Sequence, residues 1–177
     1  MRHQLETVVL STVKHHPAIV GSPQSATLAW PDESATQAFA ETLALQPALR
    51  NAFISLQGTL GAGKTTFVRH LLRALGVQGR IKSPTYAVVE PHEVPGLAIW
   101  HFDFYRFNDP REWEDAGFRD IFASPGLKLA EWPDQASGML PTPDLAITIE
   151  PTGETARTVT LTATGDRGAA LLKAVAP

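Results

Sequence analysis

Three glycines and a lysine fall within seven positions of the stretch GTLGAGKTTF, residues 58–67. Residues 58–65 match the pattern G-x-x-x-x-G-K-[ST] in full. The defining positions are Gly58, Gly63, Lys64 and Thr65. Glycines let successive backbone N–H groups point at one anion, and the N-terminus of a following helix adds partial positive charge. The pattern predicts a loop that binds the phosphates of a nucleotide.

Three polar side chains of this loop offer distinct chemistry. Lys64 supplies a mobile ammonium group for the β- and γ-phosphates, and the Thr65 hydroxyl is a hard oxygen ligand suited to Mg²⁺. Thr66 supplies one more phosphate contact or a hydroxyl at the start of the helix. The alternative is a chance match in a glycine-containing turn. A strand-like sequence before the loop and a helical one after it argue against chance.

Two carboxylates follow short apolar runs elsewhere in the chain. Asp103 comes directly after LAIWHF (97–102), and Glu131 comes directly after LKLA (127–130). Phosphate-loop proteins need such a carboxylate at the end of a neighbouring strand to hold the metal and its water. Each could instead be a solvated strand end. Together they favour one metal ligand and one group that acts on water or a nucleophile, and the sequence leaves open which is which.

The segment KSPTYAVVE, residues 82–90, carries hydroxyl groups on Ser83, Thr85 and Tyr86. It reads either as a turn leading into the strand YAVVE or as a switch loop whose hydroxyls sense a γ-phosphate. Trp132 is open to two interpretations as well, because its ring could cover a ligand or simply pack.

Strand-like and helical stretches surround these residues. AFISLQ (52–57) indicates a buried parallel strand, and Asp32 and Pro47 bound a predicted helix. After the loop, a helical apolar face ends where Gly76 can cap it. This face consists of Phe67, Val68, Leu71, Leu72 and Leu75.

The C-terminal part predicts a β-hairpin across the turn PTGET (151–155), followed by a short helix in GAALLKAVA (168–176). The alternating apolar residues are Leu145, Ile147, Ile149, Val159, Leu161 and Ala163. We therefore expect an α/β fold like that of P-loop NTPases, with a mixed β-sheet flanked by helices and a C-terminal antiparallel hairpin. Residues 31–177 are expected to form a single P-loop domain, and residues 1–30 an N-terminal extension.

Composition narrows the class of protein. The 177 residues, 44% of them hydrophobic, suit one globular domain, and no apolar run approaches the roughly 18 residues of a membrane span. The chain has no cysteine and no signal-like N-terminal segment, so we expect a cytoplasmic protein without disulfides or thiolate metal sites. A net charge of −3 disfavours autonomous nucleic-acid binding, although a local basic patch stays open.

Several motifs in a fixed order carry a family resemblance. GTLGAGKTTF, KSPTY, HFDFYR and a strand ending in EWP resemble, over residues 31–150, the bacterial tRNA threonylcarbamoyladenosine (t6A) biosynthesis ATPases of the TsaE or YjeE family. The resemblance implies a P-loop ATPase that binds ATP or ADP with Mg²⁺. It also implies TsaB and TsaD as partners that install the threonylcarbamoyl group, with ATP hydrolysis supporting repeated cycles. Contact with tRNA would then be indirect, through the complex, and no membrane is involved.

The resemblance also implies roles for individual residues. Residues 61–66 match the phosphate loop, Thr65 and Glu131 match metal ligands, and residues 83–86 match a switch-like segment. Asp103 matches an essential acidic residue, and Trp132 matches the tryptophan of an EW pair. The catalytic candidates are Lys64, Asp103 and Glu131, and the metal candidates are Thr65, Glu131 and Asp103. The nucleotide-binding candidates are Gly58, Gly61, Ala62, Gly63, Lys64, Thr65, Thr66, Thr85 and Trp132. Adenine contacts are expected around residues 32–36, with a further nucleotide contact near Gly153 or Arg157.

Other classes of P-loop protein fit less well. A small-molecule kinase is the main alternative, but such kinases use an arginine-rich lid, and the arginines here are scattered. A GTPase is weaker still, because the sequence contains no N-K-x-D stretch. A binding module without turnover overlaps with the ATPase, since a partner could complete the site.

Overall fold

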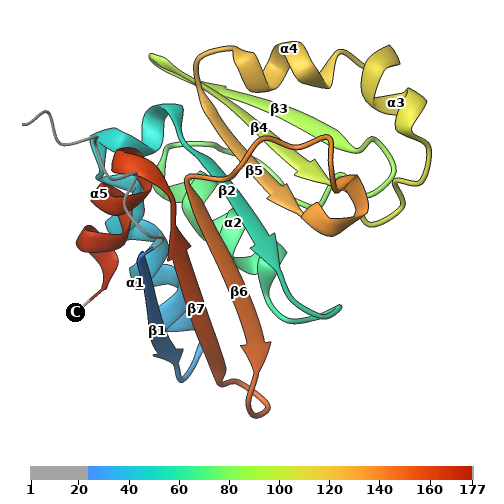
Figure 1. The fold of residues 1–177 in the computed structure, drawn as a ribbon. Coiled ribbons are helices and arrows are strands. Elements are labelled where there is room, and N and C mark those ends of the chain that lie inside the picture. Colours follow the sequence, from blue (N-terminus) through green and yellow to red (C-terminus); the bar gives the residue numbers. More distant parts are fainter. Residues whose placement is uncertain (1–23, 177) are drawn as a thin grey trace, which may run out of the picture.

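The computed structural model describes residues 24–176. A single seven-stranded sheet, in the order β1-β7-β6-β2-β5-β4-β3, lies at its centre (Figure 1). The strands are β1 (Gln24–Trp30), β2 (Phe53–Gln57), β3 (Val89–Val94), β4 (Leu97–Asp103), β5 (Leu127–Glu131), β6 (Leu145–Pro151) and β7 (Arg157–Ala163). The helices are α1 (Glu33–Ala44), α2 (Lys64–Ala74), α3 (Pro110–Asp115), α4 (Phe118–Ala123) and α5 (Gly165–Val175).

The sheet mixes parallel and antiparallel pairing. Strand β2 runs parallel to β5 on one side and to β6 on the other, and β5 runs parallel to β4. The pairs β6–β7, β7–β1 and β4–β3 are antiparallel. This confirms the predicted α/β fold with a mixed sheet and a C-terminal antiparallel hairpin. It also brings the carboxyl ends of β2, β4 and β5 to one edge, where ligand sites of such sheets usually lie.

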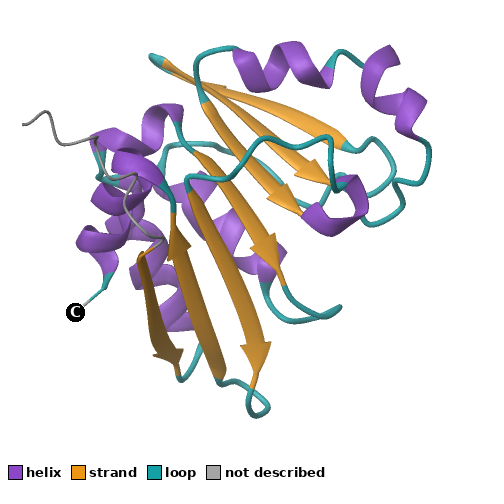
Figure 2. Ribbon diagram, viewed as in Figure 1, coloured by secondary structure: helices purple, strands orange, loops and turns teal. Residues whose placement is uncertain are grey.

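Helices cover both faces of the sheet, as the purple and orange ribbons of Figure 2 show. Helices α1, α2 and α5 pack on a largely aliphatic cluster that includes Leu43, Leu71 and Leu171. Helices α3 and α4 pack on a second cluster, rich in aromatic rings, around Phe102 and Trp113. Because side chains alternate along a strand, β2, β4 and β5 each contribute to both clusters.

Local sequence explains where α1 begins and where α2 ends. The Asp32 side chain accepts a hydrogen bond of 3.0 Å from the Ala35 N–H, which caps α1. Helix α2 ends in a left-handed Gly76, whose neighbour Val77 donates 2.9 Å to the Leu72 carbonyl, the Schellman arrangement. Among residues 24–176, no helix is long and apolar enough to cross a membrane.

The sheet extends further toward the N-terminus than the sequence indicated. Strand β1 (Gln24–Trp30) pairs along its whole length with β7, from Gln24 opposite Ala163 to Trp30 opposite Arg157. The sheet therefore includes residues on the N-terminal side of the predicted boundary between residues 30 and 31. The rest of the predicted extension, residues 1–23, lies outside the described residues.

The predicted strand YAVVE begins later than expected, at Val89 instead of Tyr86. Val88 has a positive φ of 68°, and its N–H donates 2.7 Å to the Pro84 carbonyl, so residues 84–88 close a turn. A β-branched residue in this conformation is strained, and strain of this kind often lies at functional sites. Strand β3 then forms one edge of the sheet and carries the exposed Pro91.

Candidate functional site

The glycine-rich loop joins β2 to α2, as the sequence predicted. Gly63 precedes the first helical residue, Lys64, in a left-handed conformation with φ 110°. Gly58 has φ 151°, and a Cβ atom there would lie 2.5 Å from the backbone oxygen of Ile149. A side chain at residue 58 would push the loop away from β6, so glycine is needed at this position for steric reasons. The helix N-terminus therefore opens toward the loop as an anion-binding end.

The Lys64 ammonium group is held inside the loop. Its Nζ donates 2.7 Å to the Gly58 carbonyl and 2.9 Å to the Thr59 carbonyl. The same atom lies 4.0 Å from the centroid of the Trp132 ring, a cation–π contact. Burial lowers the pKa of Lys64, while the nearby Glu131 and Asp103 carboxylates oppose that shift. A desolvated ammonium of this kind gains from a bound anion.

Glu131 lies between a hydroxyl group and an imidazole. The Thr65 hydroxyl is 3.0 Å and 2.9 Å from the two carboxylate oxygens. On the other side, Nε2 of the fully buried His101 is 2.8 Å from Oε1. Because a carboxylate oxygen only accepts hydrogen bonds, Nε2 is the nitrogen that donates here. Nδ1 of His101 is buried without a hydrogen-bond partner among the described residues.

His101 is absent from the residues that the sequence predicted for the site. A signal for it did exist, because Ile99, His101 and Asp103 alternate along β4 and share one face of the sheet. The parallel pairing of β4 with β5 then brings that face beside Glu131. The contact of this histidine with Glu131 depends on which strand lies beside β4, and the apolar run itself does not give that information.

Asp103 ties the segment 83–85 to the end of β4. Its Oδ2 accepts hydrogen bonds from the Ser83 hydroxyl and, at 3.2 Å, from the Thr85 hydroxyl. Its Oδ1 accepts a bond of 2.8 Å from the Tyr105 N–H. Movement of this segment and of the Asp103 carboxylate is therefore linked, which favours the switch-loop interpretation over an isolated turn.

A cavity of about 270 Å³ collects the predicted site residues. Its lining consists of Leu60, Gly61, Ala62, Gly63, Lys64, Thr65, Thr66, Ser83, Thr85, Asp103, Tyr105, Glu131 and Trp132. Of the catalytic candidates, the metal candidates and the nucleotide-binding candidates from Gly58 to Trp132, only Gly58 is outside this lining, and its carbonyl accepts the Lys64 ammonium proton. We call this space the phosphate cavity.

Trp132 is the second non-glycine residue with a positive φ, 56°, among the described residues. The turn it makes at the end of β5 places its ring against Lys64 and 5.0 Å from the Tyr105 ring centroid. Of the two interpretations that the sequence left open, this position favours a ring that borders the phosphate cavity.

A second cavity of about 200 Å³ adjoins the other side of the glycine-rich loop. It shares Ala62, Gly63 and Thr66 with the phosphate cavity, and Trp30, Glu33, Thr36, Glu154, Thr155 and Arg157 complete its lining. Arg157 Nε donates 2.7 Å to the Ala62 carbonyl and so braces the loop. Of the segments in which nucleotide contacts were expected, Glu33 and Thr36 from residues 32–36 therefore meet Arg157 at one cavity, whereas Gly153 is not part of its lining.

The donor set of the phosphate cavity suits Mg²⁺. Residues 24–176 contain no cluster of three or more histidines or carboxylates arranged to hold a metal. Mg²⁺ does not require one, because it commonly takes one or two protein oxygens together with waters and phosphate oxygens. The Thr65 hydroxyl and the Glu131 carboxylate, in mutual contact, supply such oxygens.

A buried parallel strand, a glycine-rich loop and a helix, with carboxylates at the ends of the two strands that follow across the sheet, define an α/β protein of the P-loop-like class. A sequence profile described as "Threonylcarbamoyl adenosine biosynthesis protein TsaE" matches residues 30–159. The chain belongs to the TsaE family.

Individual relatives agree with the profile. The chain is 43% identical over 112 residues to "tRNA threonylcarbamoyladenosine biosynthesis protein TsaE" of Haemophilus influenzae, which covers 63% of this chain and 71% of the relative. The protein of the same name from Bacillus subtilis is 37% identical over 114 residues, covering 64% and 71%. Among solved structures, "Crystal structure of Bacillus subtilus YdiB" matches with a TM-score of 0.70 and 26% identity, covering 88% of this chain and 96% of that one.

Proposed function

We propose that this protein binds Mg²⁺ and ATP and hydrolyses the ATP in support of t6A formation on tRNA, together with TsaB and TsaD in the cytoplasm. The observation that carries the proposal is the meeting of the glycine-rich loop, the Thr65–Glu131 pair and Asp103 at one cavity. The names of the relatives in H. influenzae and B. subtilis supply the pathway.

Each protein group has a defined part in this proposal. The backbone N–H groups of the loop and the Lys64 ammonium bind the β- and γ-phosphates. To do so, the ammonium group gives up its hydrogen bonds to two loop carbonyls and donates to phosphate oxygens instead. Thr65 and Glu131 would hold Mg²⁺, and His101 keeps the Glu131 carboxylate in place. Bound Mg²⁺ would neutralise charge that develops on the phosphate oxygens.

Asp103 is the group that remains to orient the attacking water. Its carboxylate lines the phosphate cavity. Unlike the Glu131 carboxylate, it does not contact the Thr65 hydroxyl but accepts hydrogen bonds from other hydroxyl groups and from a backbone N–H. Ser83 and Thr85 then connect the position of that water to the segment 83–85. The ribose and base extend past Ala62 and Gly63 into the second cavity, beside Trp30 and Arg157.

Slow hydrolysis by the isolated protein follows from the lining of the phosphate cavity. Within residues 24–176, no arginine reaches that lining, so no guanidinium is available there for the charge of the transition state. The same observation weighs against a small-molecule kinase with an arginine lid. TsaB and TsaD are the proposed source of the acceleration.

Calorimetric titration with ADP and ATP, each with and without Mg²⁺, tests the binding step. We expect uptake of one nucleotide that Mg²⁺ strengthens in the wild type and much less in Glu131→Gln. Arg73→Ala, an exposed change on α2, serves as a control with wild-type binding. Absence of Mg²⁺-dependent adenine-nucleotide binding would contradict the proposal.

Phosphate release, measured with and without purified TsaB and TsaD, tests the catalytic step. Turnover should rise when both partners are added, and Asp103→Ala should abolish it while nucleotide binding persists. Equal rates with and without the partners would remove them from the mechanism, and wild-type turnover in Asp103→Ala would remove Asp103.

A further inference from the structure

A third cavity, of about 410 Å³, lies on the other side of the segment 83–85. The segment is a shared wall, because Ser83 and Thr85 line both this cavity and the phosphate cavity. The remaining lining includes Arg80, Lys82, Pro84, Tyr86, Glu90 and His92. Nothing in the proposed ATP site uses this space, which we call the switch cavity.

The aromatic side chain at the rim of the switch cavity is exposed and held in place. Tyr86 is 86% exposed, the largest exposed fraction of any large hydrophobic side chain among the described residues. The Arg106 guanidinium carbon lies 4.7 Å from the centroid of its ring. The turn that carries it is closed by the bond from the Val88 N–H to the Pro84 carbonyl. One ring face is therefore covered by a cation, and the side chain keeps a large surface for a ligand.

The charge around the switch cavity is positive, although the chain as a whole carries −3. Arg80 and Lys82 line it and Arg106 sits over the tyrosine, against the single carboxylate of Glu90. Within the described part of the chain, none of these three cations forms an ion pair, which leaves their charge available to an anion.

A polar atom without a partner lies in the strand that lines the cavity. His92 Nε2 on β3 is buried and has no hydrogen-bond partner among residues 24–176. Burial lowers the pKa of His92, so its imidazole is neutral at pH 7 and can accept or donate one hydrogen bond. The cavity thus offers an aromatic ring, cations and one neutral hydrogen-bonding group.

We propose that the switch cavity binds an unstacked nucleotide from a single-stranded loop of tRNA. The base stacks on or beside Tyr86 and meets the polar group of His92, and its phosphates lie near Arg80 and Lys82. Proteins bind single-stranded RNA with this combination of exposed aromatic ring and positive charge. A cavity of about 410 Å³ suits an inserted nucleotide better than a flat protein contact, which needs no cavity.

The shared wall gives the RNA contact a consequence for the ATP site. Ser83 and Thr85 hydrogen-bond the Asp103 carboxylate, so a nucleotide that moves this wall also moves Asp103. The binding site itself is independent of the proposed ATPase, whereas this coupling rests on it.

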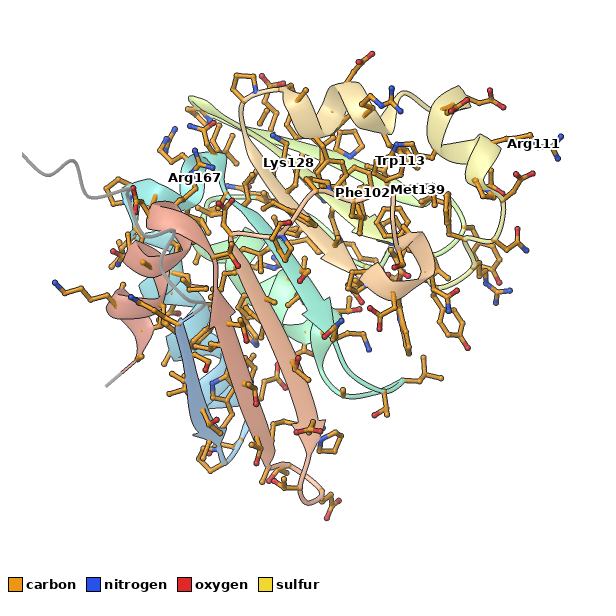
Figure 3. The ribbon with its side chains drawn as sticks, viewed as in Figure 1. Phe102, Arg111, Trp113, Lys128, Met139 and Arg167 are labelled. Atoms are coloured by element: carbon orange, nitrogen blue, oxygen red, sulfur yellow. The ribbon has the colours of Figure 1, made fainter. Side chains whose placement is uncertain are left out.

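Fluorescence anisotropy with a labelled, unmodified tRNA stem-loop tests the proposal on the full-length protein. We expect binding that Tyr86→Ala weakens about tenfold, as for loss of one base stack, and that Tyr86→Phe preserves. Lys82→Ala should lower the slope of log affinity against log salt by about 0.7, the value for one contact to a single-strand phosphate. Arg111→Ala is the matched control, because this arginine extends from α3 away from the strands (Figure 3) and its side chain is 85% exposed.

The outcomes separate the alternatives. No binding of the stem-loop, equal binding of a blunt RNA duplex, or wild-type affinity in Tyr86→Ala would each overturn the RNA site. Loss of TsaB and TsaD capture in Tyr86→Ala with unchanged RNA affinity would assign the surface to a protein partner instead. ATP calorimetry on the same variants should match the wild type, so RNA binding without ATP binding would refute the proposed ATPase and leave this site standing.

Discussion

The two faces of the sheet carry different kinds of buried side chain. The face under α1, α2 and α5 is packed with aliphatic side chains such as Leu56, Leu71 and Leu129. The face under α3 and α4 is packed with rings, and Phe102 and Trp113 lie there together in Figure 3. Phe102 alone has the ring centroids of Phe104, Phe118 and Phe122 within 5.5 Å.

The difference shows that alternate residues of one strand serve either core packing or the candidate site. Along β4, Trp100 and Phe102 point into the aromatic face, whereas His101 and Asp103 point toward the glycine-rich loop. The polar residues that β4 and β5 contribute to the candidate site, His101, Asp103 and Glu131, thus lie on one face, near the ends of the strands. The other face has only to hold those strands in place, and four substitutions test this division.

Phe102→Ala should have the largest effect on folding. The fully buried ring would leave a cavity among its aromatic neighbours, and such truncations cost about 3–5 kcal/mol of unfolding free energy. Urea unfolding followed by tryptophan fluorescence measures the loss. A cost below about 1 kcal/mol would mean that the aromatic face can repack and does not fix the strands.

Lys64→Ala should reduce ATP turnover with little effect on stability, because it removes a phosphate-binding group but no side chain of the aromatic cluster. We expect ATP turnover to fall about 100- to 1000-fold, as for loss of a group that stabilises transition-state charge. The free energy of unfolding should stay within about 1 kcal/mol, since the change also removes a buried ammonium. Arg73→Ala on the same helix is the control for turnover. A Lys64→Ala protein that hydrolyses ATP normally would exclude this lysine from the mechanism.

His101→Leu tests whether a buried residue on the loop-facing side acts through Glu131. Loss of the hydrogen bond to Oε1 should raise the Mg²⁺ concentration needed for tight nucleotide binding about 10- to 100-fold. Binding of nucleotide without Mg²⁺ should stay as in the wild type, and His101→Gln should restore part of the Mg²⁺ effect. A fall in both affinities by the same factor would indicate a general packing defect.

The smallest effect is expected for the pH dependence of stability that His92 contributes. Burial lowers its pKa below the ordinary 6.5, with repulsion from His101 in the same direction and Glu90 opposing. As pH falls below 6.5, the unfolded chain binds the proton first, so the free energy of unfolding decreases until the folded-state pKa is passed. Unfolding of the wild type and His92→Gln at pH 7.5 and 5.5 measures this, and the variant should lose less stability on acidification. Parallel behaviour of the two proteins would contradict the assignment.

Local sequence patterns were sufficient for much of this architecture. The loop pattern, the apolar face of α2 with Gly76, and the alternation in β6 and β7 are signals within a few residues, and each element formed where it was predicted. The convergence of Lys64, Asp103 and Glu131 also followed, because the ends of parallel strands meet at one edge. For the segment 83–85 the sequence left a turn and a switch loop open, and its contacts with Asp103 come from the structure.

The features that sequence reasoning missed depend on distant partners. Strand β1, QSATLAW, has mostly small or polar residues and is defined by its pairing with β7, more than a hundred positions later. Helices α3 and α4 span only six residues each, too few for a periodic signal, and are stabilised by the aromatic cluster. The turn at Val88 needs the hydrogen bond from the Asp103 N–H to its carbonyl, a contact between residues on different elements.

Pro91 has a consequence for how copies of this protein meet one another. Strand β3 is an edge, and edges with free N–H and C=O groups recruit further strands and promote aggregation. A proline there lacks one donor, and two exposed acidic residues of the same strand, Glu90 and Glu93, repel a second identical strand. Sheet growth by self-association is thereby disfavoured at β3, and the strand beside the switch cavity is kept from being buried by another molecule of the same protein.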